Sequence, residues 1–130
     1  MCFKIDYKNC PSELIAQSDI TCYKVGFKVN DETFRSYYYN TIYKMNELKE
    51  TNKLNPTYAY DSIFEIDKGF HSYINLKEAK LFFSRRMFTN IKNLCIGEFK
   101  IPVNSKYYLN KNEGTFISDK IIFAKFIDLL

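Results

Sequence analysis

The 130-residue sequence contains no tryptophan, a single histidine, three prolines and four glycines. It also lacks an apolar run of about 18 residues, the length that a membrane-spanning helix requires. Residues 1–4 do not lead into the apolar core of a signal peptide. We therefore expect a soluble intracellular protein that has no membrane partner.

Several motifs that enzymes and metal proteins use are missing. The sequence has no glycine-rich phosphate loop, no paired-carboxylate motif and no C-x-x-C pair. The four cysteines are Cys2, Cys10, Cys22 and Cys95, and their spacing disfavours both a zinc site and two disulfides. We predict free structural thiols, with Cys22 and Cys95 buried in strands, and neither a metal nor a cofactor.

The positive charge is not concentrated in the sequence. The net charge is +4, no block of five like charges occurs, and Arg85-Arg86 is the one arginine doublet. A nucleic-acid binder usually gathers its cations on one face, so a nucleic-acid partner is not indicated. The tyrosines at positions 37–39 beside Arg35 could stack on bases, but aromatic packing at a strand edge explains them more simply.

The segment that organises the chain is residues 66–87, which contain a strand end, a glycine turn, the histidine and the best helix. Asn75 stands where a helix N-cap belongs and Glu78 follows three residues later, so we predict a capping box and a helix that begins near Leu76. The helix is predicted to end near residues 89–90. Apolar residues line one face of it, which we expect to be buried: Leu76, Ala79, Phe83 and Met87. Phe82 widens this face on one side.

The rest of the chain favours strands, because it is rich in Tyr, Phe and Ile. A strong strand is predicted at residues 20–29, with one face partly exposed to solvent. It is followed by a turn at 30–32 and by the second arm of a hairpin at 33–39, which residues 40–44 could extend. Further strands are predicted at 58–66, 94–103 (interrupted by Gly97), 106–109 and 119–127, the last of them central in a sheet. Residues 1–18 are predicted to be irregular, and 47–56 to form the longest surface loop.

These elements predict one domain that spans residues 1–130. Its fold class is α+β, with a largely antiparallel, twisted sheet, continuous or split, and one main helix packed on it.

Four short segments carry a resemblance to known proteins: 22–25 (CYKV), 69–73 (GFHSY), 101–108 (IPVNSKYY) and 118–122 (SDKII). Their succession resembles a family of small uncharacterised proteins carried by bacteriophages and prophages, and the likeness extends over residues 20–125. The resemblance implies an accessory protein in the host cytoplasm, which binds a host defence protein or a signalling nucleotide.

A second resemblance concerns residues 69–83 and the strands that follow. The order of Gly69-Phe70-x-Ser72, a helix, the strand 96–101 and a late strand at 121–123 is similar to the back half of arginine-type ADP-ribosyltransferases. In that family a strand with a serine-threonine-serine motif braces an NAD site, an N-terminal strand supplies an arginine, and a glutamate precedes a late strand.

The match to that family is incomplete. Ser72 corresponds to the first serine, but Tyr73 and Ile74 replace the threonine and the second serine, and residues 20–29 contain no arginine. Asp119 is the acid close to the late strand, and Glu113 lies several residues earlier. The resemblance implies a split sheet with a groove and, as the alternative function, an NAD-using enzyme with an altered active site.

The candidate site lies on two strands that we expect to meet near the helix N-terminus, where free backbone N–H groups favour an anion. Lys24 and Arg35 would add positive charge there. His71 has an unperturbed pKa of about 6.5, which suits proton transfer, although a structural histidine bonded to a backbone carbonyl is an equally good interpretation. The candidate ligand-binding residues are Tyr23, Lys24, Arg35, His71, Ser72 and Tyr73.

Two functions follow from these observations. The first is a phage-encoded accessory protein that acts by binding, either as an inhibitor of a host immune effector such as a CRISPR nuclease or by sequestering a defence signalling nucleotide. The second is the ADP-ribosyltransferase-like enzyme. Ser72 and His71 are not expected to form a catalytic pair, because adjacent strand residues point to opposite faces.

Overall fold

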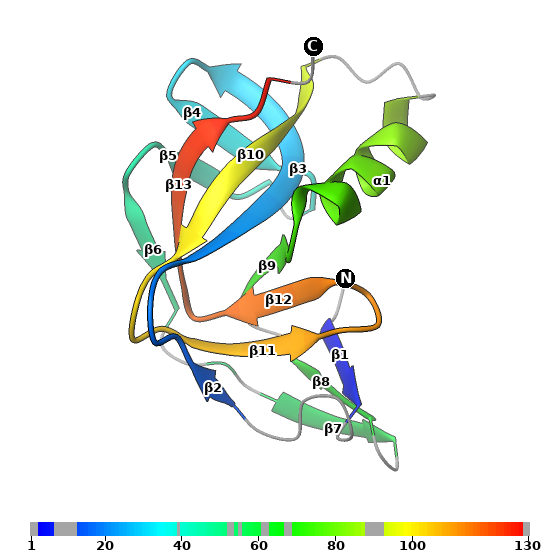
Figure 1. Ribbon diagram of the computed structural model, residues 1–130. Helices are drawn as coiled ribbons and strands as arrows, with labels where there is room; N and C mark the ends of the chain where they lie inside the picture. Colours follow the sequence, from blue (N-terminus) through cyan, green and yellow to red (C-terminus); the bar gives the residue numbers. More distant parts are fainter. Residues whose placement is uncertain are drawn as a thin grey trace.

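The computed structural model describes residues 3–6, 13–38, 40–51, 54, 56–60, 63–66, 69–87 and 93–128. Within these ranges the chain forms thirteen strands and one helix of 12 residues (Figure 1). The strands are β1 (Phe3–Asp6), β2 (Leu14–Ile15), β3 (Ile20–Asn30), β4 (Thr33–Ser36), β5 (Ile42–Lys44), β6 (Leu48–Glu50), β7 (Pro56–Tyr60), β8 (Ile63–Ile66), β9 (Phe70–Tyr73), β10 (Leu94–Ile101), β11 (Lys106–Asn110), β12 (Thr115–Ser118) and β13 (Lys120–Phe126), and the helix is α1 (Leu76–Met87).

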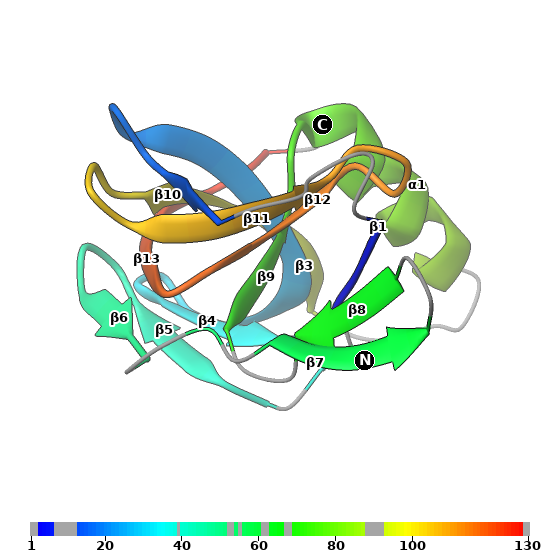
Figure 2. The same cartoon turned by 90° about the horizontal axis from the view of Figure 1, so that it is seen from below.

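The predicted fold class is wrong, because this is a mostly β protein rather than an α+β protein. Ten strands form one sheet in the order β2-β11-β12-β9-β3-β10-β13-β6, with β4 and β5 attached beside β3. The other three, β1, β8 and β7, form a small antiparallel sheet whose strand β1 lies close to β11 (Figure 2). One short helix covers part of one face, so the prediction of a main helix on an antiparallel sheet holds only in outline.

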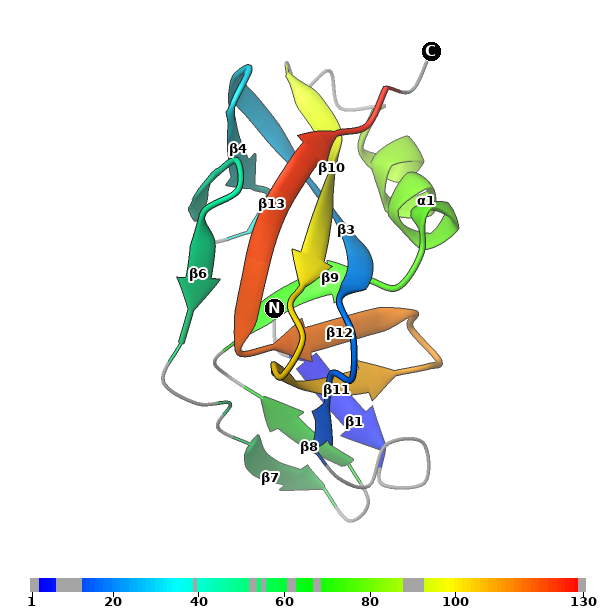
Figure 3. The same cartoon turned by 60° about the vertical axis from the view of Figure 1, so that its left-hand side comes forward.

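Five strands of the large sheet, β3, β4, β5, β10 and β13, curve round so that the chain after β5 meets β13. Strand β3 pairs with β10 on one side and with β4 on the other, β4 pairs with β5, and β13 pairs with β10. After β5, Met45 bridges to Phe123 in β13, and the Asn46 N–H donates a 2.8 Å hydrogen bond to the Phe123 carbonyl. Strands β4 and β6 therefore lie on the side of β3 and β10 that faces away from α1 (Figure 3).

Aromatic side chains fill the space that these strands enclose. The Phe34 ring is fully buried and lies 5.1 Å from the Phe99 ring and 5.5 Å from the Phe123 ring, measured between centroids. A Cβ atom at Gly26 would lie 2.6 Å from Phe34, so β3 needs glycine where this ring approaches its backbone. Strand β10 continues through Gly97, where an interruption was predicted.

Helix α1 packs on the opposite face of β3 and β10. The helix begins at Leu76 as predicted, and the Glu78 N–H donates a 2.9 Å hydrogen bond to the Asn75 side-chain oxygen. Ala79 is fully buried with Val25 and Ile96 beneath it, whereas Phe83 is only half-buried. The predicted helix end at residues 89–90 lies outside the described residues.

The strong strand at 20–29 and its hairpin turn are confirmed, but the predicted wet face of the strand is wrong. Cys22, Lys24 and Gly26 are buried, and only the end of the strand beyond Phe27 is exposed on both faces. The returning arm ends at Ser36, and β5 is a separate strand after a turn. The extra burial comes from the rings of Phe34, Tyr43 and Phe99, which pack against this face of β3.

Several short strands were not predicted. The expected irregular start contains β1 and β2, the expected surface loop contains β6 and the buried Leu54, and the expected strand 58–66 is the hairpin β7–β8. Strand β12 was also missed. Each of these strands has at most five residues, which is too few for a clear alternation, and most of them pair with a strand far along the chain, as β6 does with β13.

Candidate ligand-binding site

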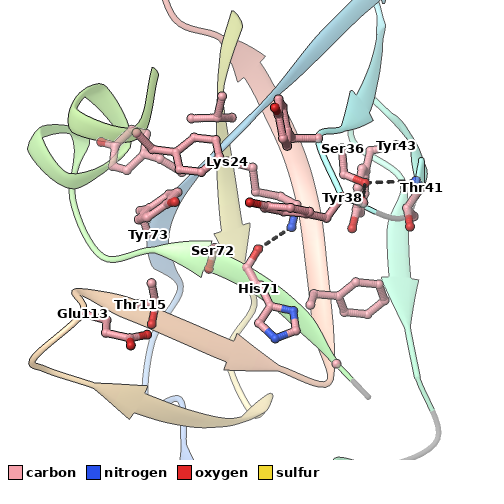
Figure 4. A pocket seen from close by; sticks show the side chains of 16 residues that line it. Lys24, Ser36, Tyr38, Thr41, Tyr43, His71, Ser72, Tyr73, Glu113 and Thr115 are labelled. Carbon is pink, nitrogen blue, oxygen red and sulfur yellow. Dashed lines mark hydrogen bonds between the residues drawn. The ribbon is translucent and has the colours of Figure 1, made fainter. Parts of the chain in front are cut away.

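A cavity of about 280 Å³ lies between β9, the turn that joins β4 to β5, helix α1 and the start of β12 (Figure 4). Five of the six candidate residues line it: Tyr23, Lys24, His71, Ser72 and Tyr73. The predicted meeting of their two strands is present, because Tyr23 in β3 and Tyr73 in β9 are partners in the sheet register. A pairing between strands 50 residues apart in sequence therefore builds the site.

Gly69 allows β9 to start at this position. Its φ of 141° lies in a region that side-chain-bearing residues rarely adopt, and an added Cβ atom would lie 2.6 Å from both Ile117 and Leu54. Strand β12 then pairs along the outer edge of β9, which places Thr115 opposite Tyr73. The strand that carries His71 and Ser72 is thus held on both edges.

One wall of the cavity consists of four aromatic side chains, Tyr37, Tyr38, Tyr73 and Phe82, which we call the aromatic wall. The Phe82 ring lies at its centre, with its centroid 5.4 Å from Tyr37, 6.2 Å from Tyr38 and 6.0 Å from Tyr73. Tyr38 is 37% exposed, so the wall reaches the surface. The rings come from the β4–β5 turn, β9 and α1, and only the folded chain brings them together.

Ser36 holds the turn that presents two of these rings. Its hydroxyl group donates a 2.5 Å hydrogen bond to the Tyr38 carbonyl and accepts a 3.0 Å hydrogen bond from the Thr41 N–H. The Ser36 N–H also donates to the Thr41 carbonyl at 2.9 Å. A single buried side chain thus bridges both ends of the turn.

Lys24 is the charged residue buried at the cavity. The residue is only 9% exposed, and its ammonium group donates a hydrogen bond to the His71 carbonyl. The Nζ atom also lies 5.5 Å from the centroid of the Tyr43 ring and 6.0 Å from that of Phe99. Burial lowers the pKa of Lys24 to about 8, so the group is still mostly protonated near pH 7.

Three other ionisable groups near Lys24, those of His71, Cys22 and Tyr43, are neutral near physiological pH. Burial, together with the nearby Lys24 charge, lowers the pKa of His71 to about 4. Burial raises the pKa of the Cys22 thiol to about 12, and Ser72 lies next to this thiol. Burial likewise raises the pKa of Tyr43. His71 therefore lacks the pKa near neutrality that suggested proton transfer.

Two predicted sources of positive charge are not at the cavity. Arg35 lies outside it, with its guanidinium carbon 4.6 Å from the centroid of the Phe27 ring. Side chains alternate along β4, so Ser36 faces the cavity and Arg35 the other side. The first turn of α1 does not line the cavity either, and the side chain of Asn75 caps that turn.

The sequence interpretation missed several residues of the site. Tyr37 and Tyr38 were noticed, but strand packing was preferred over ligand stacking, and Phe82 was assigned only to the helix face. Glu113 and Thr115 also line the cavity. Glu113 was noted only as an acid that precedes the late strand, and no local pattern marks Thr115, because both reach the site through the pairing of β12 with β9.

The acid suggested by the transferase resemblance is elsewhere in the fold. Asp119 is buried, and its carboxylate accepts a 2.9 Å hydrogen bond from the Lys106 N–H. It does not line the cavity, whereas Ser72 and Glu113 do. Asp119 therefore closes the junction of β11 and β12 rather than facing a ligand.

Cys22 and Cys95 are free thiols in β3 and β10, as predicted, with Cys22 buried and Cys95 partly buried. Over the described ranges, no three His, Cys, Asp or Glu side chains are grouped so that they could hold a metal ion. In the same part of the chain, no helix has the length and apolar character needed to cross a membrane.

Comparisons with known proteins return no relative. No protein-family model matches the sequence, and no curated protein and no solved structure matches the chain. The resemblance to phage-carried proteins therefore stays a prediction, and the cavity itself is the basis for inferring a function.

Proposed function

We propose that the protein binds a small molecule with a flat ring in this cavity and does not alter it chemically. The observation that carries the proposal is the aromatic wall, in which rings from three elements meet beside a cavity of about 280 Å³. Stacking of a base on an aromatic side chain contributes about 1–3 kcal/mol. A planar ligand would thus gain affinity from residues that also stabilise the folded wall.

The protonation states around the cavity favour binding over catalysis. His71, with its pKa lowered to about 4, is a weak base near neutral pH, and the Cys22 thiol, with its pKa raised to about 12, supplies almost no thiolate. Ser72 and His71 are neighbours in β9 and point to opposite faces of the strand. These residues are arranged to shape a cavity rather than to transfer protons.

The biological setting of the proposal comes from the sequence. The resemblance to phage and prophage proteins suggests an accessory protein in the host cytoplasm that withdraws a defence signalling nucleotide by binding it. Such a nucleotide contains a base that would stack against the aromatic wall. Inhibition of a host immune effector, for example a CRISPR nuclease, is the protein-binding form of the same counter-defence role.

Direct titration tests the proposal. Because the chain contains no tryptophan, its fluorescence comes from its 11 tyrosines, five of which line the cavity. We expect adenosine, cyclic nucleotides or ADP-ribose to quench this emission, and Tyr38→Ala to weaken binding by about ten-fold, equivalent to about 1.4 kcal/mol. Tyr107→Ala is the matched control, because Tyr107, in β11, packs on Phe116 of β12 and does not line the cavity.

Three results would contradict the proposal. The first is equal affinity of the wild type and Tyr38→Ala, and the second is no binding of any ring compound. The third is consumption of NAD with release of nicotinamide, which would restore the transferase-like alternative. If a host protein copurifies and no ring compound binds, we would infer that the protein acts through another surface.

A further inference from the structure

We infer that the ligand carries an anionic group that pairs with the Lys24 ammonium group, so that the ligand class is a planar ring bearing a phosphate or a carboxylate. This inference rests on the proposed function and specifies its ligand. The observation behind it is a buried positive charge that lines the cavity without a counter-ion from the described part of the chain.

Buried lysines are normally paired, because an isolated charge loses its hydration and gains nothing in return. Lys24 is nine-tenths buried, and within the described ranges its hydrogen bond goes to the uncharged His71 carbonyl. The rings of Tyr43 and Phe99 give weaker cation–π attraction. The ion pairs of the described residues involve other lysines, Lys28 with Asp31 and Lys100 with Asp19.

Among the residues that the structure describes, the groups next to Lys24 do not supply a negative charge. The Cys22 thiol lies on the same face of β3, but burial raises its pKa to about 12 and it is protonated near neutral pH. Tyr43 is likewise a neutral phenol, and His71 is neutral. An ammonium group has three N–H donors, and one of them serves the His71 carbonyl. No acceptor in the described part of the chain takes the other two, which leaves them for a ligand oxygen.

The cavity gives such an anion an approach to Lys24. Both Lys24 and the exposed Tyr38 line it, and in Figure 4 their side chains point toward its middle. A ring stacked on the aromatic wall would therefore lie close to the ammonium group. Lys24 also has a structural role, because its hydrogen bond to a carbonyl ties β3 to β9. A neutral donor could make the same bond, so this role does not explain why the group is charged.

Glu113 indicates how the ligand is oriented in the cavity. Its carboxylate lies on the exposed turn before β12 and also lines the cavity, beside Thr115 and apart from Lys24 (Figure 4). An anionic group is repelled there and attracted to Lys24. Hydroxyl or amino donors of the ligand would then face Glu113, a pattern that a nucleotide with its ribose hydroxyls fits.

Pairs of probes that differ in one anionic group test the inference. Adenosine is compared with AMP, and indole with indole-3-acetate, against the wild type, Lys24→Met, Glu113→Gln and Lys125→Met. Lys125 is the matched control, because it is exposed on β13 and lies outside the cavity. We expect the wild type and Lys125→Met to bind the anionic probe of a pair about ten-fold more tightly than the neutral probe.

In Lys24→Met this preference should disappear while affinity for the neutral ring stays the same, and in Glu113→Gln the preference should remain. Retention of the preference in Lys24→Met, or equal binding of both probes to the wild type, overturns the inference and leaves ring binding in place. Absence of binding by every ring compound overturns the proposed function as well. The two failures are therefore distinguishable.

A second measurement does not depend on how the variants fold. In wild-type protein with isotope-labelled lysine, the NMR signal of Lys24 should titrate near a pKa of about 8. Adding AMP should raise that pKa, because a nearby anion stabilises the ammonium form. A Lys24 signal whose titration is unchanged at saturating AMP contradicts the inference.

Discussion

Replacing Lys24 by methionine should stabilise the ligand-free protein, although it removes a hydrogen bond. Burial lowers the pKa of Lys24 from 10.5 to about 8. One pKa unit corresponds to about 1.4 kcal/mol, so carrying this charge near pH 7 costs the folded state about 3 kcal/mol. Loss of the bond to the His71 carbonyl offsets about 1 kcal/mol of that gain. We expect Lys24→Met to be more stable by about 2 kcal/mol.

The pH dependence of the free energy of unfolding tests the same prediction in a second way. The folded protein releases the Lys24 proton near pH 8, whereas the unfolded chain keeps it until about pH 10.5. Wild-type stability therefore gains about 1 kcal/mol from this residue between about pH 7 and pH 9, and Lys24→Met lacks that gain. Cys22 and Cys95 act in the opposite direction above about pH 9, because burial raises the pKa of each to about 12.

Urea unfolding of the wild type, Lys24→Met and Lys125→Met, followed by far-UV circular dichroism at about pH 7 and pH 9, measures both effects. Lys125→Met should match the wild type, because its side chain is exposed. A loss of more than about 1 kcal/mol in Lys24→Met near pH 7 would refute the reasoning, since burial of an unpaired charge predicts a gain. Lys24 would then be a structural residue and its charge no sign of a ligand.

Three further predictions concern the fold and the turn. Phe34→Ala should lower the free energy of unfolding by urea by about 3–5 kcal/mol, because the Phe34 ring is fully buried, and Phe83→Ala should lower it less, because Phe83 is only half-buried. Equal losses of stability would show that the core does not lie around Phe34. Asn75→Ala should cost about 1 kcal/mol by removing the cap of α1, and no loss would mean that the cap contributes nothing. Ser36→Ala should fold but bind ring compounds several-fold more weakly, because the turn that holds Tyr38 loses its hydrogen bonds. Unchanged affinity in the fluorescence titration would show that the turn keeps its shape without this hydroxyl group.

The sequence by itself determined the elements whose signals are local. The N-cap at Asn75 and the alternation along residues 20–30 depend on neighbours within one turn or one strand, so the start of α1 and the strand β3 were predicted correctly. The meeting of Tyr23 with Tyr73 was also anticipated.

Only the tertiary structure decided the fold class and the character of the site. Strands β6 and β12 have only three and four residues, too few for a recognisable alternation, and their places in the sheet depend on pairing with β13 and β9 from far along the chain. Lys24 alternates with apolar residues and so suggested a wet face. Its burial arises where β9 covers β3 and the β4–β5 turn closes over it, and no local pattern in a sequence encodes such long-range contacts.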